Sequence, residues 1–177
     1  MQNNQTMASD LSLPKVPGFI QEKSGKYKAR KPLSEAQIIK AAQAILKRKF
    51  HKGIAFTSPD AAGNYLTMKY STYQHEVFLC MFLDNQHKLI KLEEMFKGTI
   101  DGASVYPREV VKKALLLNAS ALIFAHNHPS GACKPSHADK SITESLKNAL
   151  DLVDIRVIDH FIIGGSGRYS FAEHGFI

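Results

Sequence analysis

The 177-residue sequence has only two cysteines and no long apolar run. Two cysteines are too few for a disulfide framework and are typical of a protein kept in a reducing compartment. No apolar stretch approaches the roughly 18 residues that a membrane-spanning helix needs, and no hydrophobic segment follows the polar start at residues 1–10. We therefore expect a soluble, cytoplasmic protein.

Acidic residues are scarce at the beginning of the chain. Residues 1–53 hold 11 Lys and Arg but only 3 Asp and Glu, whereas residues 54–177 hold 12 and 13 and are nearly neutral. This distribution excludes a uniformly basic nucleic-acid-binding module. Residues 1–33, which contain the run KSGKYKARK, are predicted to form a basic, poorly ordered arm. Such an arm is either a solvated tail or a contact for the phosphates of DNA.

The rest of the chain alternates between helical and strand patterns. A capping box at Ser34 and Gln37 opens a helical lead-in over residues 34–56. Residues 57–177 then form the main domain, for which the pattern favours an α/β fold with a mixed β-sheet flanked by helices. We expect helices over 34–49, 61–73, 107–119 and 136–150, and strands over 77–83, 88–98, 121–125, 156–163 and 169–171.

A possible metal site lies where the predicted strand 121–125 ends. His126 and His128 are separated by one residue, and in an extended chain both imidazoles point to the same face. Asp139 lies in the first turn of the next helix, so its carboxylate can turn back toward the histidines. Two imidazoles, one carboxylate and a water are a ligand set typical of catalytic zinc. The alternatives are an incidental histidine pair and a plain capping box from Ser136 to Asp139.

The string H-x-H-P-x6-S-x2-D resembles the JAMM signature of MPN-domain metalloproteases. The similarity to the bacterial RadC branch of that group extends from about residue 57 to residue 177, through segments 96–99, 105–110, 126–131 and 159–163. The resemblance implies a cytidine-deaminase-like JAB/MPN fold with zinc bound by His126, His128 and Asp139. It also implies that Ser136 stabilises an oxyanion, and that a zinc-activated water attacks an amide bond of a protein or peptide substrate.

Active proteases of this group also use an upstream glutamate as general base. Two adjacent residues, Glu93 and Glu94, are available, and in a strand they face opposite sides. If Leu92, Glu94 and Phe96 share the core face, then Glu94 is the base; a different register selects Glu93. We prefer Glu93. The alternative is that both are surface charges on a hairpin, which would leave the hydrolase without its base.

Two other functions share part of this evidence. The first is a DNA-associated repair or recombination factor, as the RadC family name suggests, that uses the domain as a non-hydrolytic scaffold. The second is a zinc nuclease, for which Lys134 is the only basic residue in the motif loop. A deaminase is disfavoured, because no Pro-Cys-x-x-Cys motif follows the histidines. The helix-hairpin-helix region usual in full-length RadC proteins is not recognisable, so the sequence resembles the short forms found on mobile elements.

Overall fold

The computed structural model describes residues 16–49, 59–98 and 105–177. The chain divides into two compact units, residues 1–50 and 51–177. The second unit corresponds to the main domain expected from residue 57 onward. The first contains the segment expected as an arm, residues 1–33, and residues 34–50 of the expected helical lead-in.

The described part of the first unit is a β-hairpin followed by a helix. Strands β1 (Phe19–Gln21) and β2 (Tyr27–Ala29) pair antiparallel, and the rings of Phe19 and Tyr27 meet edge to face, 6.5 Å apart. Residues 19–29, which belong to the segment expected as a poorly ordered arm, thus form a hairpin in which part of the lysine-rich run pairs with the residues that precede it. Residues 1–15 lie outside the described part. Helix α1 (Glu35–Lys49) begins with the expected capping box.

The described part of the second unit contains one five-stranded sheet, in the order β4-β3-β5-β6-β7. Strands β5 and β6 are parallel and the other neighbours are antiparallel, which confirms the mixed sheet. Among the described residues, no helix is both long and apolar enough to cross a membrane. The elements are α2 (Pro59–Tyr70), β3 (Val77–Leu83), β4 (Leu89–Lys97), α3 (Pro107–Leu116), β5 (Ala121–Asn127), α4 (His137–Asp151), β6 (Arg156–Gly164) and β7 (Gly167–Ser170).

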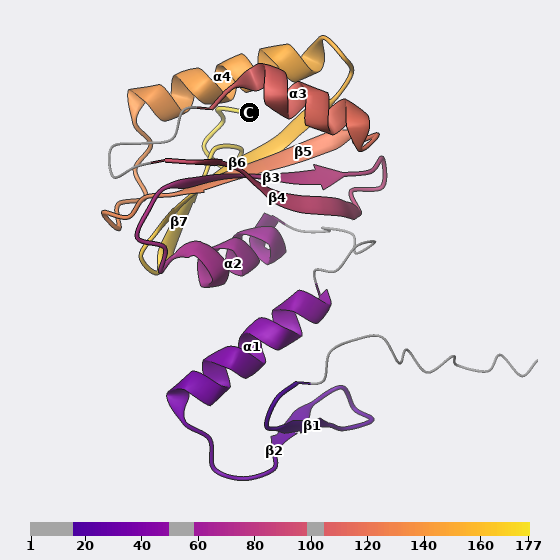
Figure 1. Ribbon diagram of the computed structural model, residues 1–177, viewed down its shortest axis with the longest axis vertical. Helices are drawn as coiled ribbons and strands as arrows, with labels where there is room; N and C mark the ends of the chain where they lie inside the picture. Colours follow the sequence, from indigo (N-terminus) through magenta and orange to yellow (C-terminus); the bar gives the residue numbers. More distant parts are fainter. Residues whose placement is uncertain (1–15, 50–58, 99–104) are drawn as a thin grey trace, which may run out of the picture. The chain divides into compact units, whose positions relative to one another are not determined.

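Helices cover both faces of this sheet (Figure 1), with α3 and α4 on one face and α2 on the other. Every residue of β3 and of β5 is buried, as their continuous apolar runs predict. Phe124 lies under α3 and α4 in a cluster with Phe78, Leu146 and Leu150. The candidate site lies at the end of β5 on this same face.

Two helices end earlier than their apolar patterns predict. Helix α3 ends at Leu116 because Asn118 takes a left-handed conformation (φ 49°), which asparagine tolerates. The N–H groups of Asn118 and Ala119 then donate to the carbonyls of Leu115 and Ala114, closing a Schellman motif. Helix α2 ends at Tyr70, three residues before the expected end. The chain after it forms a turn that leads into β3.

Candidate metal centre

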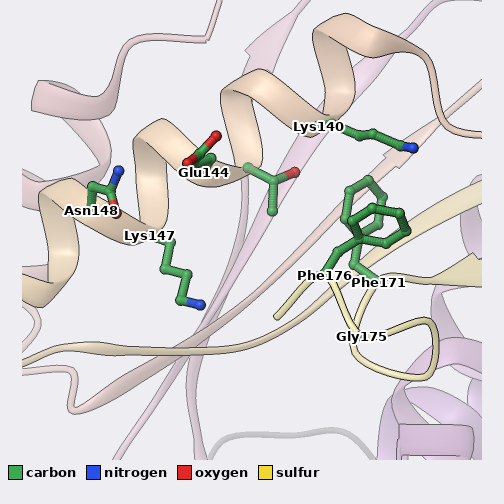
Figure 2. Close-up of a pocket in the computed structure, with 8 residues that line it drawn as sticks. Lys140, Glu144, Lys147, Asn148, Phe171, Gly175 and Phe176 are labelled. Carbon is green, nitrogen blue, oxygen red and sulfur yellow. The ribbon is translucent and has the colours of Figure 1, made fainter.

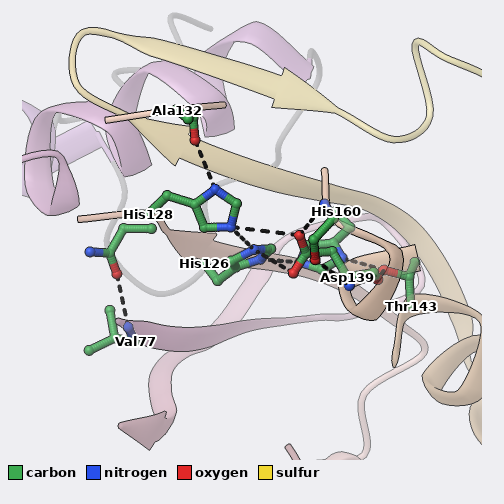
Figure 3. Close-up of polar contacts among 9 residues, drawn as sticks. Val77, His126, His128, Ala132, Asp139, Thr143 and His160 are labelled. Atoms are coloured by element: carbon green, nitrogen blue, oxygen red, sulfur yellow. Dashed lines mark hydrogen bonds and ion pairs between the residues drawn. The ribbon is translucent and has the colours of Figure 1, made fainter. Parts of the chain in front are cut away.

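Three side chains from two elements meet at the end of β5 (Figure 3). His126 is the sixth residue of β5, His128 follows the strand, and Asp139 lies in the first turn of α4. The Nε2 atoms of the two histidines are 3.0 Å apart. The Asp139 carboxylate lies 3.1 Å from Nε2 of His126 and 3.6 Å from Nε2 of His128. The prediction that these residues come together is confirmed.

The distances and the donor set fit a metal ion. Ligands about 2.1 Å from a tetrahedral ion lie roughly 3.4 Å from one another, close to the three separations above. Nδ1 of His128 lies 2.8 Å from the Ala132 carbonyl. Because a carbonyl only accepts, that nitrogen carries the proton and Nε2 of His128 is a bare lone pair. A lone pair, a second imidazole nitrogen and a carboxylate therefore face one another, which is the arrangement a cation would stabilise.

The surroundings of Asp139 keep it ionised. Partial burial raises the pKa of this carboxyl, but hydrogen bonds and the charge of His126, together with hydrogen bonds from Ser136, outweigh the burial. The pKa of Asp139 is therefore held well below its usual range. The centre thus offers a charged carboxylate oxygen at neutral pH.

This shift predicts a pH dependence of stability in the metal-free chain. A carboxyl whose pKa is lower in the folded than in the unfolded chain stabilises the fold above its ordinary pKa near 4. That stabilisation, on the order of 1–3 kcal/mol, is lost as the pH falls further. Urea unfolding measures the free energy of unfolding at about pH 6 and about pH 3. The decrease between these two pH values should be smaller in Asp139→Asn than in the wild type. Asp151→Asn, an exposed change at the end of α4, is the control, and an equal loss in all three chains would contradict the assignment.

The loop between the ligands is fixed against the end of β6. The N–H of His128 donates to the carbonyl of Ile163 at 2.8 Å. Gly164 is required beside it, because a Cβ there would lie 2.6 Å from the Gly131 carbonyl oxygen. Gly131 itself has φ +82°, a conformation that favours glycine. The histidine pair is therefore held by backbone contacts that leave little room for rearrangement.

Ser136 caps α4. Its Oγ accepts from the N–H of Asp139 at 3.1 Å, and its own N–H donates to the Asp139 carboxylate at 2.7 Å. The capping-box interpretation is therefore confirmed. It is compatible with metal binding, because the Asp139 carboxylate also lies close to both histidines. The role of Ser136 at an oxyanion stays a prediction.

Glu93 and Glu94 lie on opposite faces, as expected, but a bulge in β4 changes which side chains share a face. Phe96 pairs with Phe78, whereas Glu94 pairs with Leu79, so Met95 is the extra residue. Glu94 accepts a hydrogen bond from Tyr73 at 3.3 Å, and Glu93 lies on the α3 side.

The Glu93 carboxylate has two lysine partners. It lies 2.8 Å from Nζ of Lys91 and 2.9 Å from Nζ of Lys113. Burial raises the pKa of Glu93, and the two lysines more than offset that rise, so the pKa lies below its usual range. Its assignment as general base stays a prediction, and these contacts are those of a structural ion-pair cluster.

Glu76 was not among the candidates from sequence. In the register of the sheet it lies closer to the histidines than Glu93 does. Phe78 pairs with His126 across the antiparallel β3–β5 ladder, and its ring stacks on that imidazole. The Gly98 N–H donates to the Glu76 carbonyl, so the chain continues beyond Val77 in register with β4. Because side chains alternate along a strand, we expect the Glu76 side chain on the face of Phe78, in register with the position of His128. In the sequence, the only sign of this placement is that an acidic residue stands two positions before Phe78.

Asn127 holds the segment that carries Glu76. Its buried side chain accepts from the Val77 N–H at 2.9 Å and donates to the His75 carbonyl at 3.0 Å. Asn127 lies between the two histidines in sequence, so one short stretch of chain supplies two candidate ligands and anchors the neighbouring segment.

His160, which lies in one of the RadC-like segments of the sequence, contacts the centre directly. It is fully buried on β6, and its Nε2 lies 2.8 Å from Nδ1 of His126. Burial and the neighbouring imidazole of His126 lower the pKa of His160 well below its usual range. The pairing of β5 with β6 places Phe124 beside His160, a contact between distant segments that composition does not reveal.

A pocket of about 450 Å³ lies farther along α4 (Figure 2). Lys140, Glu144 and Lys147 line it on the helix side, and Phe171 and Phe176 line it on the side of the C-terminal segment. The Lys140 ammonium lies 4.4 Å from the centre of the Phe176 ring. The pocket is lined from the helix turn that follows Asp139.

Comparison with known families agrees with this geometry. The family model of the RadC-like JAB domain matches residues 56–176. The chain belongs to the RadC-like JAB family. Two relatives from Vibrio cholerae, each named UPF0758 protein, are 52% identical over 143 residues and 49% identical over 155 residues. These matches cover 81% and 88% of this chain, and 90% and 98% of the relatives. A UPF0758 protein from Xylella fastidiosa is 46% identical over 165 residues, covering 93% of this chain and 70% of its own.

Membership of the RadC family accounts for the mixed sheet and for the placement of the His-His-Asp group. JAB domains are commonly hydrolytic and metal-binding, and the described part of this RadC-like domain contains a group that could hold a metal ion. The family assignment from sequence is confirmed.

Proposed function

We propose that this protein is a zinc-dependent hydrolase of peptide or isopeptide bonds. The observation that carries the proposal is the convergence of His126, His128 and Asp139 on one point. The side chains of His128 and Asp139 are 18% and 13% exposed, so the group is open to solvent on one side. Three protein ligands with an open fourth position are typical of a catalytic rather than a structural zinc.

The bound ion would lower the pKa of a coordinated water to about 7 and polarise the scissile carbonyl. Ser136 is suited to stabilise the developing oxyanion, because its capping bond uses the hydroxyl as an acceptor and leaves the hydroxyl proton to donate. Glu76 is suited to take the proton from the attacking water and pass it to the leaving amine. Glu93, the preference from sequence, is the alternative base, but its lysine partners favour a structural role.

A degradomics experiment tests this proposal. The zinc-loaded chain is incubated with a proteome-derived peptide library, and new N-termini are identified by mass spectrometry. We expect cleavage that stops on addition of a chelator and returns with zinc, and that is absent in Asp139→Asn. Cleavage that persists in the chelated chain or in Asp139→Asn would contradict the proposal, as would a zinc-loaded chain that cleaves nothing in peptide and isopeptide libraries.

The hairpin of the first unit favours a second function, contact with DNA. We infer that β1, β2 and the residues that flank them bind the phosphate backbone. The hairpin region exposes five basic side chains and a single acidic one, Glu22. Short basic hairpins of this kind can neutralise phosphates without reading sequence. The basic residues are Lys23, Lys26, Lys28, Arg30 and Lys31.

Charge reversal in the hairpin is expected to weaken DNA binding and to reduce its dependence on salt. In Lys26→Glu/Lys28→Glu, the slope of log affinity against log salt should fall by about 0.9 for each phosphate that the hairpin no longer neutralises. The control is Lys97→Glu/Lys112→Glu, which reverses two exposed charges on the second unit. Fluorescence anisotropy of a duplex oligonucleotide measures both slopes. Equal slopes in the wild type and the hairpin variant would contradict the inference.

A further inference from the structure

The two histidines of the metal centre differ in what fixes their protons. His128 donates from Nδ1 to a carbonyl, so its Nε2 is a bare lone pair. His126 instead faces another imidazole, and Nε2 of His160 could either accept from Nδ1 of His126 or donate to it. The availability of the His126 lone pair therefore depends on His160.

Thr143 settles the direction of the hydrogen bonds. Its hydroxyl lies 2.5 Å from the backbone carbonyl of Asp139, which only accepts, so the hydroxyl proton points there. The same oxygen lies 2.6 Å from Nδ1 of His160 and must accept from it. A neutral His160 protonated at Nδ1 has a bare Nε2, which accepts the proton on Nδ1 of His126. Nε2 of His126 then has a lone pair that points at His128 and Asp139.

The packing around His160 allows little reorientation of this chain of hydrogen bonds. The His160 ring stacks on Phe171 at 4.9 Å and meets the edge of Phe124 at 5.9 Å. His160 is 0% exposed, and His126 and Thr143 are each 2% exposed. Bulk water therefore competes poorly for these hydrogen bonds, and the hydroxyl of Thr143 ties His160, and through it His126, to the backbone of Asp139 (Figure 3).

We propose that His160 is a positioning residue for the metal centre, holding the proton of His126 on Nδ1, with Thr143 as the acceptor that orients it. The proposal rests on the proposed metal site and adds an outer partner to it. Metal-bound histidines usually donate to a carboxylate, a carbonyl or a water. A neutral imidazole in that place fixes the tautomer without adding negative charge near the metal.

NMR of the 15N-labelled full chain tests the direction of the bond. We expect a scalar coupling across the hydrogen bond between Nδ1 of His126 and Nε2 of His160, with the proton attached to His126. His128, which donates to a carbonyl, is the internal control with no such coupling. The spectrum is recorded with zinc bound and again in the metal-free chain at about pH 9, where histidines are ordinarily neutral. A proton attached to His160 Nε2, or no coupling in either state, would overturn the proposal.

Zinc affinity, measured by competition with a chelator, gives the second readout. His160→Phe keeps an aromatic ring at this position but removes the nitrogen that accepts from His126. Its affinity for zinc should be roughly 10- to 100-fold lower than that of the wild type. His160→Gln supplies an amide oxygen to His126 and should recover most of that loss, and Thr143→Val should fall between them. Equal affinities in the wild type and in His160→Phe or Thr143→Val would contradict the proposal. A wild-type chain that binds no zinc would refute the proposed function, while the metal-free spectrum would still locate the His126 proton.

Discussion

A chain that carries both His126→Ala and His128→Ala is expected to purify without stoichiometric zinc. The double change removes two of three protein ligands and leaves a single carboxylate, which is a poor zinc site on its own. The affinity should fall by more than roughly 100-fold, the upper end of what loss of an outer partner alone costs. Inductively coupled plasma mass spectrometry of wild type and variant, purified in parallel, measures the bound metal per chain.

Removing any two histidines also reduces nonspecific metal binding to the chain, so the comparison needs a matched variant. His137→Ala/His174→Ala removes two exposed histidines outside the triad and should retain the wild-type zinc content. Thermal unfolding of the metal-free chains shows whether each variant is folded. A folded His126→Ala/His128→Ala chain that still holds stoichiometric zinc would refute the metal-ligand assignment.

Glu76→Gln is expected to keep zinc and lose hydrolysis. The amide preserves the size of the side chain and removes the base, so kcat/KM for a cleaved peptide should fall by about 10²–10⁴-fold. Zinc content should stay at the wild-type level, because Glu76 is not one of the three ligands. The measurement is the cleavage rate of a peptide found in the library experiment, with the metal content of the same sample.

Glu93→Gln is the matched variant for this test. It makes the same chemical change on the same face of the sheet, but at a carboxylate held by Lys91 and Lys113. We expect its cleavage rate to stay near that of the wild type, with a modest loss of stability from the unpaired lysines. A reversed result, with Glu93→Gln inactive and Glu76→Gln active, would restore the preference made from sequence.

Much of the fold follows from local patterns in the sequence. The apolar runs of β3 and β5 are long enough for strands and too short for helices, and both are buried throughout. The capping box at Ser136 marks the start of α4 correctly. The spacing of His126 and His128 places both imidazoles on one side because the chain is extended there. These features depend on neighbouring residues, and so they can be recognised without knowledge of the tertiary structure.

The features that were missed depend on contacts between distant segments. The bulge at Met95 changes the face of Glu94, and a bulge leaves no clear mark in an apolar–polar pattern. Glu76 is recognisable only once β3 is paired with β5, and His160 only once β6 lies beside β5. The hairpin at residues 19–29 was hidden by its high charge, because strand patterns are identified mainly from apolar residues.

X-ray absorption spectroscopy of the zinc-loaded wild-type chain tests the central claim most directly. A zinc ion held by His126, His128 and Asp139 should show four nitrogen or oxygen neighbours at about 2.0–2.2 Å. It should also show the outer scattering of two imidazole rings. A sulfur neighbour at about 2.3 Å or a shell without imidazole scattering would contradict the proposed centre.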